Sequence, residues 1–168
     1  RCDNVQRDPG GGGINVAHAI HELGGEARAL WTKGGVTGEL MGDLIDQIGI
    51  EHQPIPISDL TRQNLIAHDR TSGRGYRFIV PGPQLNMEDK KRILDAIAAL
   101  TPTPDYLVLS GSLPPGAGDD FYAEITAAAP IDCCICVDST SGALGHALQS
   151  GVYLAKPNVR ELSELVDE

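Results

Sequence analysis

The chain has 168 residues, and its 13 Lys and Arg against 23 Asp and Glu give a formal net charge of −10. This length suits one ordinary domain or a piece of a larger one, and a hydrophobic content of 41% excludes wholesale disorder. The acidic balance repels phosphate, so we expect neither nucleic acid nor a membrane as a partner, and no apolar run is long enough for a membrane span. The chain starts at Arg1 without a signal-peptide pattern, so we expect a cytoplasmic protein whose natural start lies upstream.

Three of the four cysteines lie in one apolar run, residues 131–137, which predicts a buried strand. Cys133 and Cys134 are neighbours and point to opposite faces of such a strand, so they cannot easily share a metal ion. Cys134 and Cys136 share a face, but no second ligand pair follows at the spacing of a zinc site. We therefore expect small buried side chains in a reducing compartment, and the same for Cys2.

Apolar periodicity predicts three helices, one strand and one hairpin in the first hundred residues. The first helix is Asn15–Leu23 and ends at Gly24 and Gly25, and the strand Ala27–Trp31 follows it. The second helix is capped by Thr37 and closed by Gly49, and the third is capped by Asn86. Two alternating segments, 64–71 and 76–80, flank the turn 72–75 and predict a hairpin with one open face. This hairpin projects from the remaining structure as a lid or a contact surface.

After Pro104 the chain alternates regularly between apolar strands and amphipathic helices. The predicted strands are 106–109, 131–137 and 152–155, and the predicted helices are 121–129, 142–149 and one opening at Asn158. This alternation predicts a parallel sheet covered by helices on both faces. Sites in such sheets lie beyond the carboxyl ends of the strands, which directs attention to 110–112, 138–139 and 156–158.

A run of four glycines precedes the first predicted helix. In Pro9–Ala17 the glycines leave backbone N–H groups unshielded, and the helix start adds a partial positive charge. Together these features predict a site for an anion or a polyol, with Asn15 capping the helix or binding a ligand hydroxyl. A flexible loop with a capping Asn is the alternative. The run is neither a Walker A loop nor a Rossmann fingerprint, which also disfavours a dehydrogenase.

The chain resembles the PfkB (ribokinase-like) sugar kinases over nearly its whole length. Gly11–Ala17 is followed by six residues and Gly24, and then by nine residues and Gly34, as in the N-terminal signature of that family. Further matches occur in order at 34–39, 61–65, 76–78, 110–116 and 156–161. The glycine run without Lys and the Thr-Arg-Gln-Asn segment most resemble the PfkB-type bacterial 6-phosphofructokinases.

The resemblance implies roles for residues around a phosphorylated sugar. Gly11, Gly12, Gly13 and Asn15 would contact the sugar hydroxyls, Arg62 would bind the existing phosphate, and Ser112 would complete the phosphate site. A planar and permanently charged guanidinium suits phosphate binding. The alternatives are a surface arginine on the hairpin and a serine in an ordinary turn.

The same resemblance implies a site for ATP and magnesium at Lys156, Asn158 and Glu161, which match the Asn-x-x-Glu motif of the family. Glu161 would orient magnesium through water, since magnesium gives up its water reluctantly. An Asn three residues before a Glu is also the pattern of a helix capping box, and the two interpretations are compatible.

The segment Gly116–Asp119 reads like the catalytic Gly-Ala-Gly-Asp of the family, but it stands in the wrong place. The family motif follows the nucleotide site, whereas this segment precedes it, and Leu113 occupies the position of a small polar residue. We expect Asp119 or Asp120 to cap the next helix, and we expect the catalytic Asp downstream of this chain.

The resemblance implies a ribokinase-like, three-layer α/β/α fold with a mostly parallel sheet and a small β-sheet lid. Residues 1–168 would be the N-terminal part of a single kinase domain, incomplete at both ends, with the lid hairpin at about 61–80. The implied reaction is ATP-dependent phosphorylation of fructose 6-phosphate in glycolysis by a homodimer paired through the lid. This chain alone would be inactive. The alternatives are a 1-phosphofructokinase, a tagatose-6-phosphate kinase or a noncatalytic sugar-binding homologue.

Overall fold

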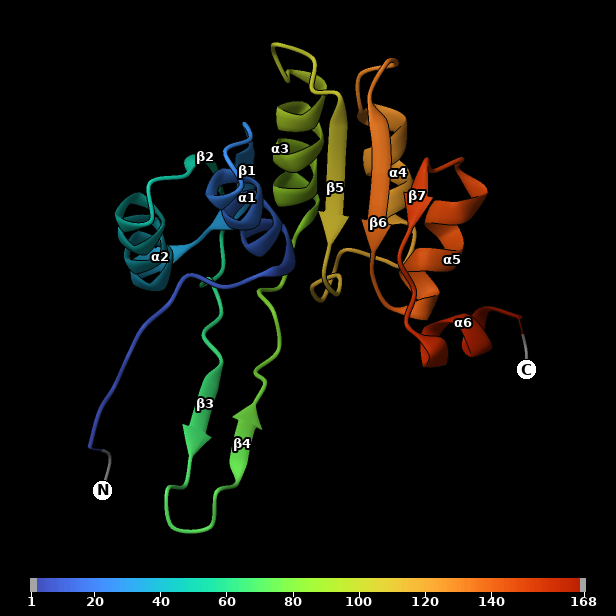
Figure 1. Ribbon diagram of the computed structural model, residues 1–168. Helices are drawn as coiled ribbons and strands as arrows, with labels where there is room; N and C mark the ends of the chain where they lie inside the picture. Colours follow the sequence, from blue (N-terminus) through green and yellow to red (C-terminus); the bar gives the residue numbers. More distant parts are fainter. Residues whose placement is uncertain (1–2, 167–168) are drawn as a thin grey trace.

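The computed structural model describes residues 3–166 and alternates helices with short strands (Figure 1). The helices are α1 (Gly12–Glu22), α2 (Gly35–Gln47), α3 (Met87–Ala98), α4 (Phe121–Ala128), α5 (Ser141–Gln149) and α6 (Val159–Val166). The strands are β1 (Arg28–Lys33), β2 (Glu51–Pro56), β3 (Leu65–His68), β4 (Gly75–Phe78), β5 (Tyr106–Ser110), β6 (Cys134–Asp138) and β7 (Leu154–Ala155). No helix within 3–166 has the length and apolar character needed to cross a membrane.

The strands pair in three groups. β1 pairs with β2 in parallel, β5, β6 and β7 form a second parallel sheet in that order, and β3 pairs with β4 in the antiparallel sense. The antiparallel pair extends well away from the other two groups (Figure 1). The predicted architecture of parallel strands, helices and a separate hairpin is therefore confirmed, although the parallel strands within 3–166 form two hydrogen-bonded sheets rather than one.

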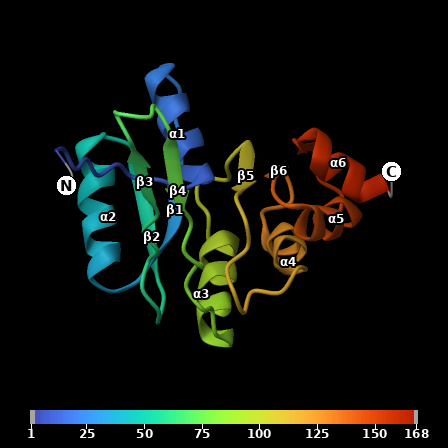
Figure 2. The same cartoon turned by 90° about the horizontal axis from the view of Figure 1, so that it is seen from below.

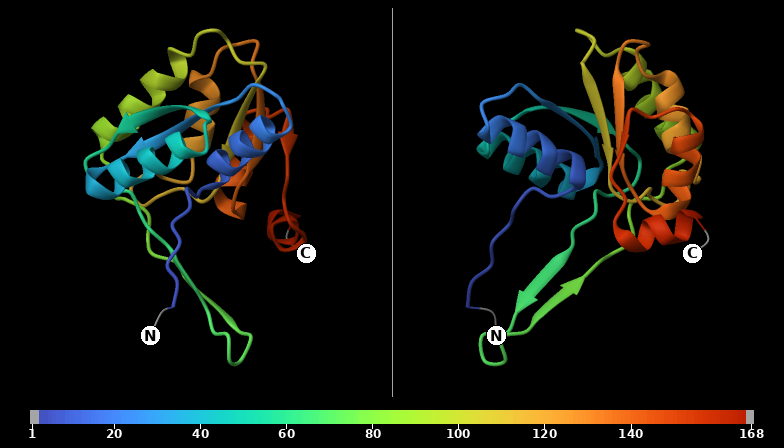
Figure 3. Two further views of the ribbon diagram at one scale, coloured as in Figure 1. Left: turned by 60° about the vertical axis from the view of Figure 1, so that its left-hand side comes forward. Right: turned by 45° about the vertical axis from the view of Figure 1, so that its right-hand side comes forward.

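Helices cover one face of the β5–β6–β7 sheet. Leu109, Ile135 and Val137 point to that face and belong to a core shared with α3, α4 and α5, which lie on the same side of the strands in the right-hand view of Figure 3. The other face contacts α1 next to β5 but leaves Tyr106 57% and Leu154 55% exposed. Within residues 3–166, helices therefore lie on both sides of the sheet, with three on one face and α1 beside β5 on the other.

Strand β2 has no counterpart among the predicted elements. Its sequence contains Pro54 and Pro56, and proline cannot donate a hydrogen bond to a neighbouring strand. β2 pairs with β1 alone, so it is an edge strand, and its outer side needs no donors. Ile55 is buried between the two prolines and contributes the apolar contact that the strand makes with the core.

The predicted cap of α3 is confirmed. The side chain of Asn86 accepts hydrogen bonds from the N–H groups of Glu88 and Asp89, each at 2.9 Å. Asp89 accepts in return from the N–H of Asn86 at 3.1 Å, which completes a capping box. The start of α3 is thus encoded in four consecutive residues.

The predicted side-chain caps of α1, α2 and α4 do not form. α1 starts at Gly12 with Gly11 as its N-cap, so Asn15 lies inside the first turn and does not cap it. Gly34 is the N-cap of α2, and Thr37 lies within that helix. Asp120 is the N-cap residue of α4, but its side chain makes no capping hydrogen bond. Asp119 lies against Gly142 at the start of α5, where a Cβ on Gly142 would be 3.4 Å from Asp119 Oδ2.

The predicted strand 131–137 begins three residues later, at Cys134. Ile131 is 97% exposed, because residues 130–133 form a turn. In this turn the N–H of Cys133 donates to the carbonyl of Pro130. Cys133, Cys134 and Cys136 are free thiols and are only partly buried. Burial raises the pKa of the Cys133 and Cys136 thiols, which lowers their reactivity at neutral pH. Cys2 lies outside the described residues.

Candidate substrate and nucleotide site

The carboxyl ends of β5 and β6 point toward the same side of the molecule as the lid (Figure 1). Ser110 and Asp138 end these strands and are directly opposite each other in the sheet. Figure 2, seen from below, places α6 on the far side of β5 and β6 from the lid. The predicted sugar residues and the predicted nucleotide residues therefore flank this edge of the sheet from two sides.

The glycine run forms the start of α1. Gly11 has φ of +114°, which a residue with a side chain rarely adopts, and no side chain caps the helix. Within residues 3–166, no acceptor takes the N–H groups of Gly12, Gly13 or Ile14. These three donors and the helix dipole are thus available to an anion or to hydroxyl groups.

The glycine run packs against the end of β5. A Cβ on Gly12 would lie 2.1 Å from Ser110 Oγ and 2.8 Å from Ser110 Cβ, so only glycine allows this approach. Ser112 follows two residues later and is exposed. The structure therefore brings the predicted glycine run and the loop that carries Ser112 together, across about a hundred residues of sequence.

Gly111, between these two serines, is fixed by three hydrogen bonds. Its N–H donates to the carbonyl of Asp138 at 2.9 Å, and its own carbonyl accepts from Tyr122 Oη at 3.0 Å and from Ser139 Oγ at 2.9 Å. Burial, with a smaller contribution from the charge of Asp138, raises the pKa of Tyr122 to about 12. Sequence analysis did not identify Tyr122, which has no motif around it, and it gave Ser139 no role beyond its place at a strand end.

The backbone at Arg62 is anchored to the end of β1. Thr61 donates its N–H to Gly34 at 3.0 Å and its hydroxyl to the carbonyl of Thr32 at 3.1 Å, and it accepts from the N–H of Gly34 at 2.9 Å. Gly34 cannot carry a side chain, because a Cβ would lie 1.6 Å from the carbonyl oxygen of Asp59. Arg62 itself is exposed and makes no hydrogen bond or ion pair with residues 3–166. Its guanidinium is therefore free to meet a ligand.

Two side chains tie the two arms of the lid together. Asp59, which precedes β3, accepts from the N–H of Gln84, which follows β4, at 2.8 Å. Asn64, directly before β3, accepts from the N–H of Val80 at 3.1 Å. The N–H groups of Gln84 and Leu60 lower the pKa of the Asp59 carboxyl below its usual value. These ties hold the base of the lid as one unit.

Asp89 anchors the lid base to α3. Its side chain is fully buried and accepts from the N–H of Ser58 at 3.1 Å and from the Ser58 hydroxyl at 3.2 Å. Arg92 forms an ion pair with the same carboxylate. Burial by itself would raise the pKa of Asp89, but the hydrogen bonds from Asn86 and Ser58 and the pairing with Arg92 outweigh it, so the pKa is lowered. The carboxylate stays charged and holds the start of the lid in place.

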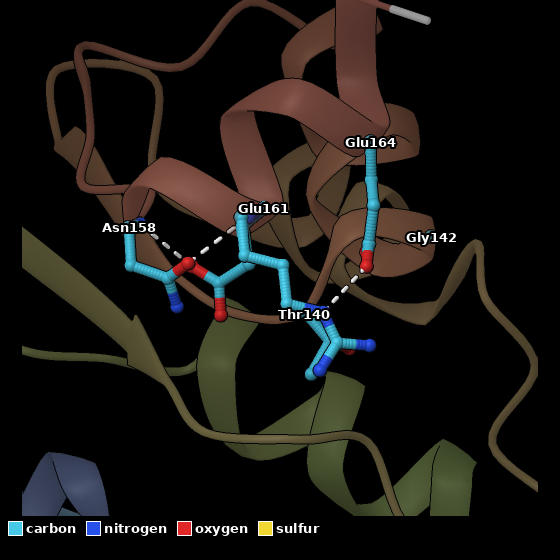
Figure 4. Close-up of a pocket in the computed structure, with 6 residues that line it drawn as sticks. Thr140, Gly142, Asn158, Glu161 and Glu164 are labelled. Carbon is cyan, nitrogen blue, oxygen red and sulfur yellow. Dashed lines mark hydrogen bonds and ion pairs between the residues drawn. The ribbon is translucent and has the colours of Figure 1, made fainter. Parts of the chain in front are cut away.

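A pocket of about 390 Å³ lies between the start of α5 and α6 (Figure 4). Its lining residues are Thr140, Gly142, Asn158, Arg160, Glu161 and Glu164. The N–H of Asn158 donates to Glu161 Oε2 at 2.8 Å, and the N–H of Glu161 donates to Asn158 Oδ1 at 2.9 Å. The capping box is therefore formed, and it lies in the wall of the pocket.

Lys156 belongs to a different contact. Its Nζ lies 3.1 Å from Asp138 Oδ1, at the carboxyl end of β6, and it is absent from the pocket wall. The Lys156 side chain is 72% exposed and that of Asp138 is 42% exposed, so water screens the pair and it is open to exchange with a ligand. Of the three residues predicted to bind nucleotide, the structure thus groups two in one pocket and places the third at the sheet edge.

Comparison with known proteins identifies the family. Residues 1–168 match the pfkB family carbohydrate kinases. The chain belongs to this family. ATP-dependent 6-phosphofructokinase isozyme 2 from Escherichia coli is 43% identical over 169 residues, which cover 99% of this chain and 54% of that protein. The enzyme of the same name from Mycobacterium tuberculosis is 38% identical over 172 residues, which cover 99% of this chain and 49% of that protein.

Solved structures of Escherichia coli phosphofructokinase-2 have the same fold. Its tetrameric inhibited form and its complex with fructose-6-phosphate each superpose with a TM-score of 0.93 at 40% identity, covering 100% of this chain and 56% of theirs. The ribokinase-like fold is therefore confirmed. The chain spans about half the length of the relatives it matches.

The side-chain oxygens at the pocket between α5 and α6 fit a magnesium ion that is held through water. Asn158 and Glu161 offer oxygen atoms, which magnesium prefers. The single side-chain oxygen of Asn158 and one of the two of Glu161 already accept a hydrogen bond in the capping box. Residues 3–166 contain no group of three or more His, Cys, Asp or Glu side chains that could hold a metal ion directly. A magnesium ion at this pocket would draw most of its ligands from water and nucleotide phosphates.

Proposed function

We propose that this chain is the N-terminal half of an ATP-dependent 6-phosphofructokinase, which converts fructose 6-phosphate into fructose 1,6-bisphosphate in glycolysis. The uncapped start of α1 beside the Ser110–Ser112 loop carries this proposal, because its three free N–H groups form a site that suits a polyol or an anion. The names of the two relatives at 43% and 38% identity support the choice of substrate. These substrates are cytoplasmic metabolites, so we propose a cytoplasmic location.

In this proposal the sugar lies against the glycine run. Gly11, Gly12, Gly13 and Asn15 contact its hydroxyl groups, and Ser112 completes the site for its phosphate from the adjacent loop. Arg62 binds the same phosphate, for which a planar fork of N–H donors is well suited. The anchoring of Thr61 to Gly34 supports the role of Arg62, since it fixes the backbone from which the guanidinium extends.

ATP lies at the other side of the sheet edge. Asn158 and Glu161 orient the magnesium–nucleotide complex at the pocket, and Lys156 contacts phosphate by exchanging its partner Asp138 for the ligand. Bound magnesium supplies charge neutralisation for the phosphates during transfer. The general base that takes the proton of the C1 hydroxyl is not among the residues of this chain, so we expect the isolated 168-residue chain to show no kinase activity.

The proposal includes a domain organisation and a partner. Residues 1–168 form the N-terminal part of a single kinase domain with the lid at about 61–80. Leu65, Ala67, Tyr76 and Phe78 share one face of the lid hairpin, as their pairing register shows. Leu65, Tyr76 and Phe78 are 61%, 47% and 58% exposed, which is costly for an apolar sheet face in water. A second copy of the lid would cover this face in a homodimer.

Steady-state kinetics of the full-length enzyme, meaning this chain continued by the second half that its relatives have, test the proposal. The substrates are fructose 6-phosphate, tagatose 6-phosphate and fructose 1-phosphate, each with Mg-ATP. We expect the highest kcat/KM for fructose 6-phosphate. A preference for either other ketose would overturn the proposed substrate, and an absence of ATP turnover with all three would indicate a noncatalytic sugar-binding protein.

A further inference from the structure

The turn after β5 is held by two hydroxyl groups that have no part in the site proposed above. The carbonyl oxygen of Gly111 accepts from Tyr122 Oη at 3.0 Å and from Ser139 Oγ at 2.9 Å. Both donors are buried, with Tyr122 8% and Ser139 4% exposed. They come from α4 and from the loop between β6 and α5, so they hold the carbonyl from two separate elements. An oxygen fixed in this way has little freedom to turn.

The direction of this carbonyl sets the direction of the next N–H. The Gly111–Ser112 peptide is trans and planar, so the N–H of Ser112 points away from the oxygen of Gly111. Because the oxygen points at two buried hydroxyls, the N–H points to the opposite side, where Ser112 itself is exposed. Within residues 3–166 no acceptor takes this N–H. The turn therefore presents a preformed donor to solvent.

This donor belongs to the same surface as the glycine run. Ser110, two residues before Ser112, is in contact range of Gly12, whose N–H is also unused among the described residues. The N–H of Gly111 is tied to the carbonyl of Asp138 at 2.9 Å, so the turn cannot shift along the strand without breaking that bond. The two hydroxyls oppose rotation of the 111–112 peptide, because such a rotation would break both of their hydrogen bonds.

We propose that Tyr122 and Ser139 are positioning residues, which orient the Gly111–Ser112 peptide so that the N–H and hydroxyl of Ser112 face the phosphorylated sugar at the start of α1. This inference rests on the function proposed above. Neither hydroxyl contacts the ligand, since both are buried behind the turn. Burial raises the pKa of Tyr122 to about 12, so its phenol keeps the donating proton well into the alkaline range.

Three variants of the full-length enzyme test this role: Tyr122→Phe, Ser139→Ala and the double variant. Each single change removes one hydrogen bond, and we expect the KM for fructose 6-phosphate to rise about five-fold. The second hydroxyl still holds the carbonyl in each single variant, so the rise in the double variant should exceed the product of the single effects. The kcat and the KM for ATP should stay nearly unchanged. Calorimetric titration with fructose 6-phosphate in the absence of ATP should show a matching loss of binding affinity in each variant.

Tyr106→Phe and Ser150→Ala are matched controls, because they remove exposed hydroxyls far from the turn and should leave every constant unchanged. Lower stability with a normal KM for the sugar phosphate in either single variant would show a merely structural role and overturn the proposal, even where the double variant fails to fold. A parent enzyme that does not phosphorylate fructose 6-phosphate would instead refute the proposed function. An active parent with unaffected variants would refute only the positioning role.

Discussion

Gly12 is a residue at which the proposed sugar site has no room for a single added carbon. In Gly12→Ala the new Cβ would meet Ser110 Oγ at 2.1 Å and Ser110 Cβ at 2.8 Å, so α1 or the turn after β5 must move. Overpacking of this kind costs about 1–3 kcal/mol, and we expect the KM for fructose 6-phosphate to rise roughly ten-fold. Steady-state kinetics of the full-length enzyme measure this change.

Gly10→Ala is the control for that variant, since nothing lies within 4 Å of a Cβ at Gly10. The control should retain the KM of the parent enzyme. An equal rise in KM in both variants would mean that flexibility of the glycine run matters, rather than the close approach of Gly12 to Ser110.

Tyr122 makes the folding stability of the protein depend on pH in the alkaline range. Burial, followed by the charge of Asp138, raises its pKa to about 12 from the usual 10, so the folded protein retains a proton that the unfolded chain loses. The contribution of protonated Tyr122 to the free energy of unfolding is complete below pH 10 and is lost as the pH rises through about 12. A pKa shift of this size corresponds to about 3 kcal/mol. We expect urea unfolding between pH 9 and about 12 to show a smaller loss of stability in Tyr122→Phe than in the parent. If the free energy of unfolding fell equally with pH in the parent and in Tyr122→Phe, this account would be contradicted.

At the scale of single elements, the capping box of α3 supports both the helix and the lid base. Asn86 accepts from Glu88 and Asp89, and its Nδ2 donates to Ser58 Oγ at 3.1 Å. Asn86→Ala removes these bonds and should lower the free energy of unfolding by about 1 kcal/mol. Urea unfolding of the full-length enzyme measures this loss. Asn86→Ser, which keeps an acceptor, should recover part of it, and exposed Asn4→Ala should change nothing.

The same elements show what a sequence can reveal about a fold. The cap at Asn86 was predictable because its partners are the next residues in the chain. Asn15 and Thr37 are equally good capping residues by type, but the helices begin earlier, where glycines can adopt the required backbone and pack closely. β2 was not predictable because Pro54 and Pro56 disfavour a strand unless its outer edge is free, and that edge is a property of the assembled sheet.

For the candidate site, the motifs in the sequence led to residues that the structure does bring near one another, such as the glycine run and the loop of Ser112. Their roles stay predictions. Tyr122 and Ser139 could not be found from the sequence, because a hydroxyl that donates to a distant carbonyl has no local pattern. Asp89 could be recognised as a partner of Asn86, but its contact with Ser58, 31 residues away, depends on how the lid base packs on α3.

At the scale of the whole molecule, the lid is the feature least explained by this chain alone. It extends away from both parallel sheets (Figure 1), and the face formed by Leu65, Ala67, Tyr76 and Phe78 is apolar. The opposite face carries Ile66, His68 and Arg77, so the two faces differ in polarity. Asp59, Asn64 and Asp89 fix the base of the hairpin, which keeps the apolar face in a defined position.

Phe78→Asp tests the proposed pairing of lids. The substitution places a charge on the apolar face, opposite Leu65 in the strand register. Burying an unpaired carboxylate against a second copy costs several kcal/mol. We expect sedimentation of the full-length enzyme at micromolar concentration to change from dimer to monomer. Arg77→Gln, on the opposite face of the same strand, should remain dimeric. A monomeric parent, or a Phe78→Asp variant that stays dimeric, would contradict the pairing of two lids through this apolar face.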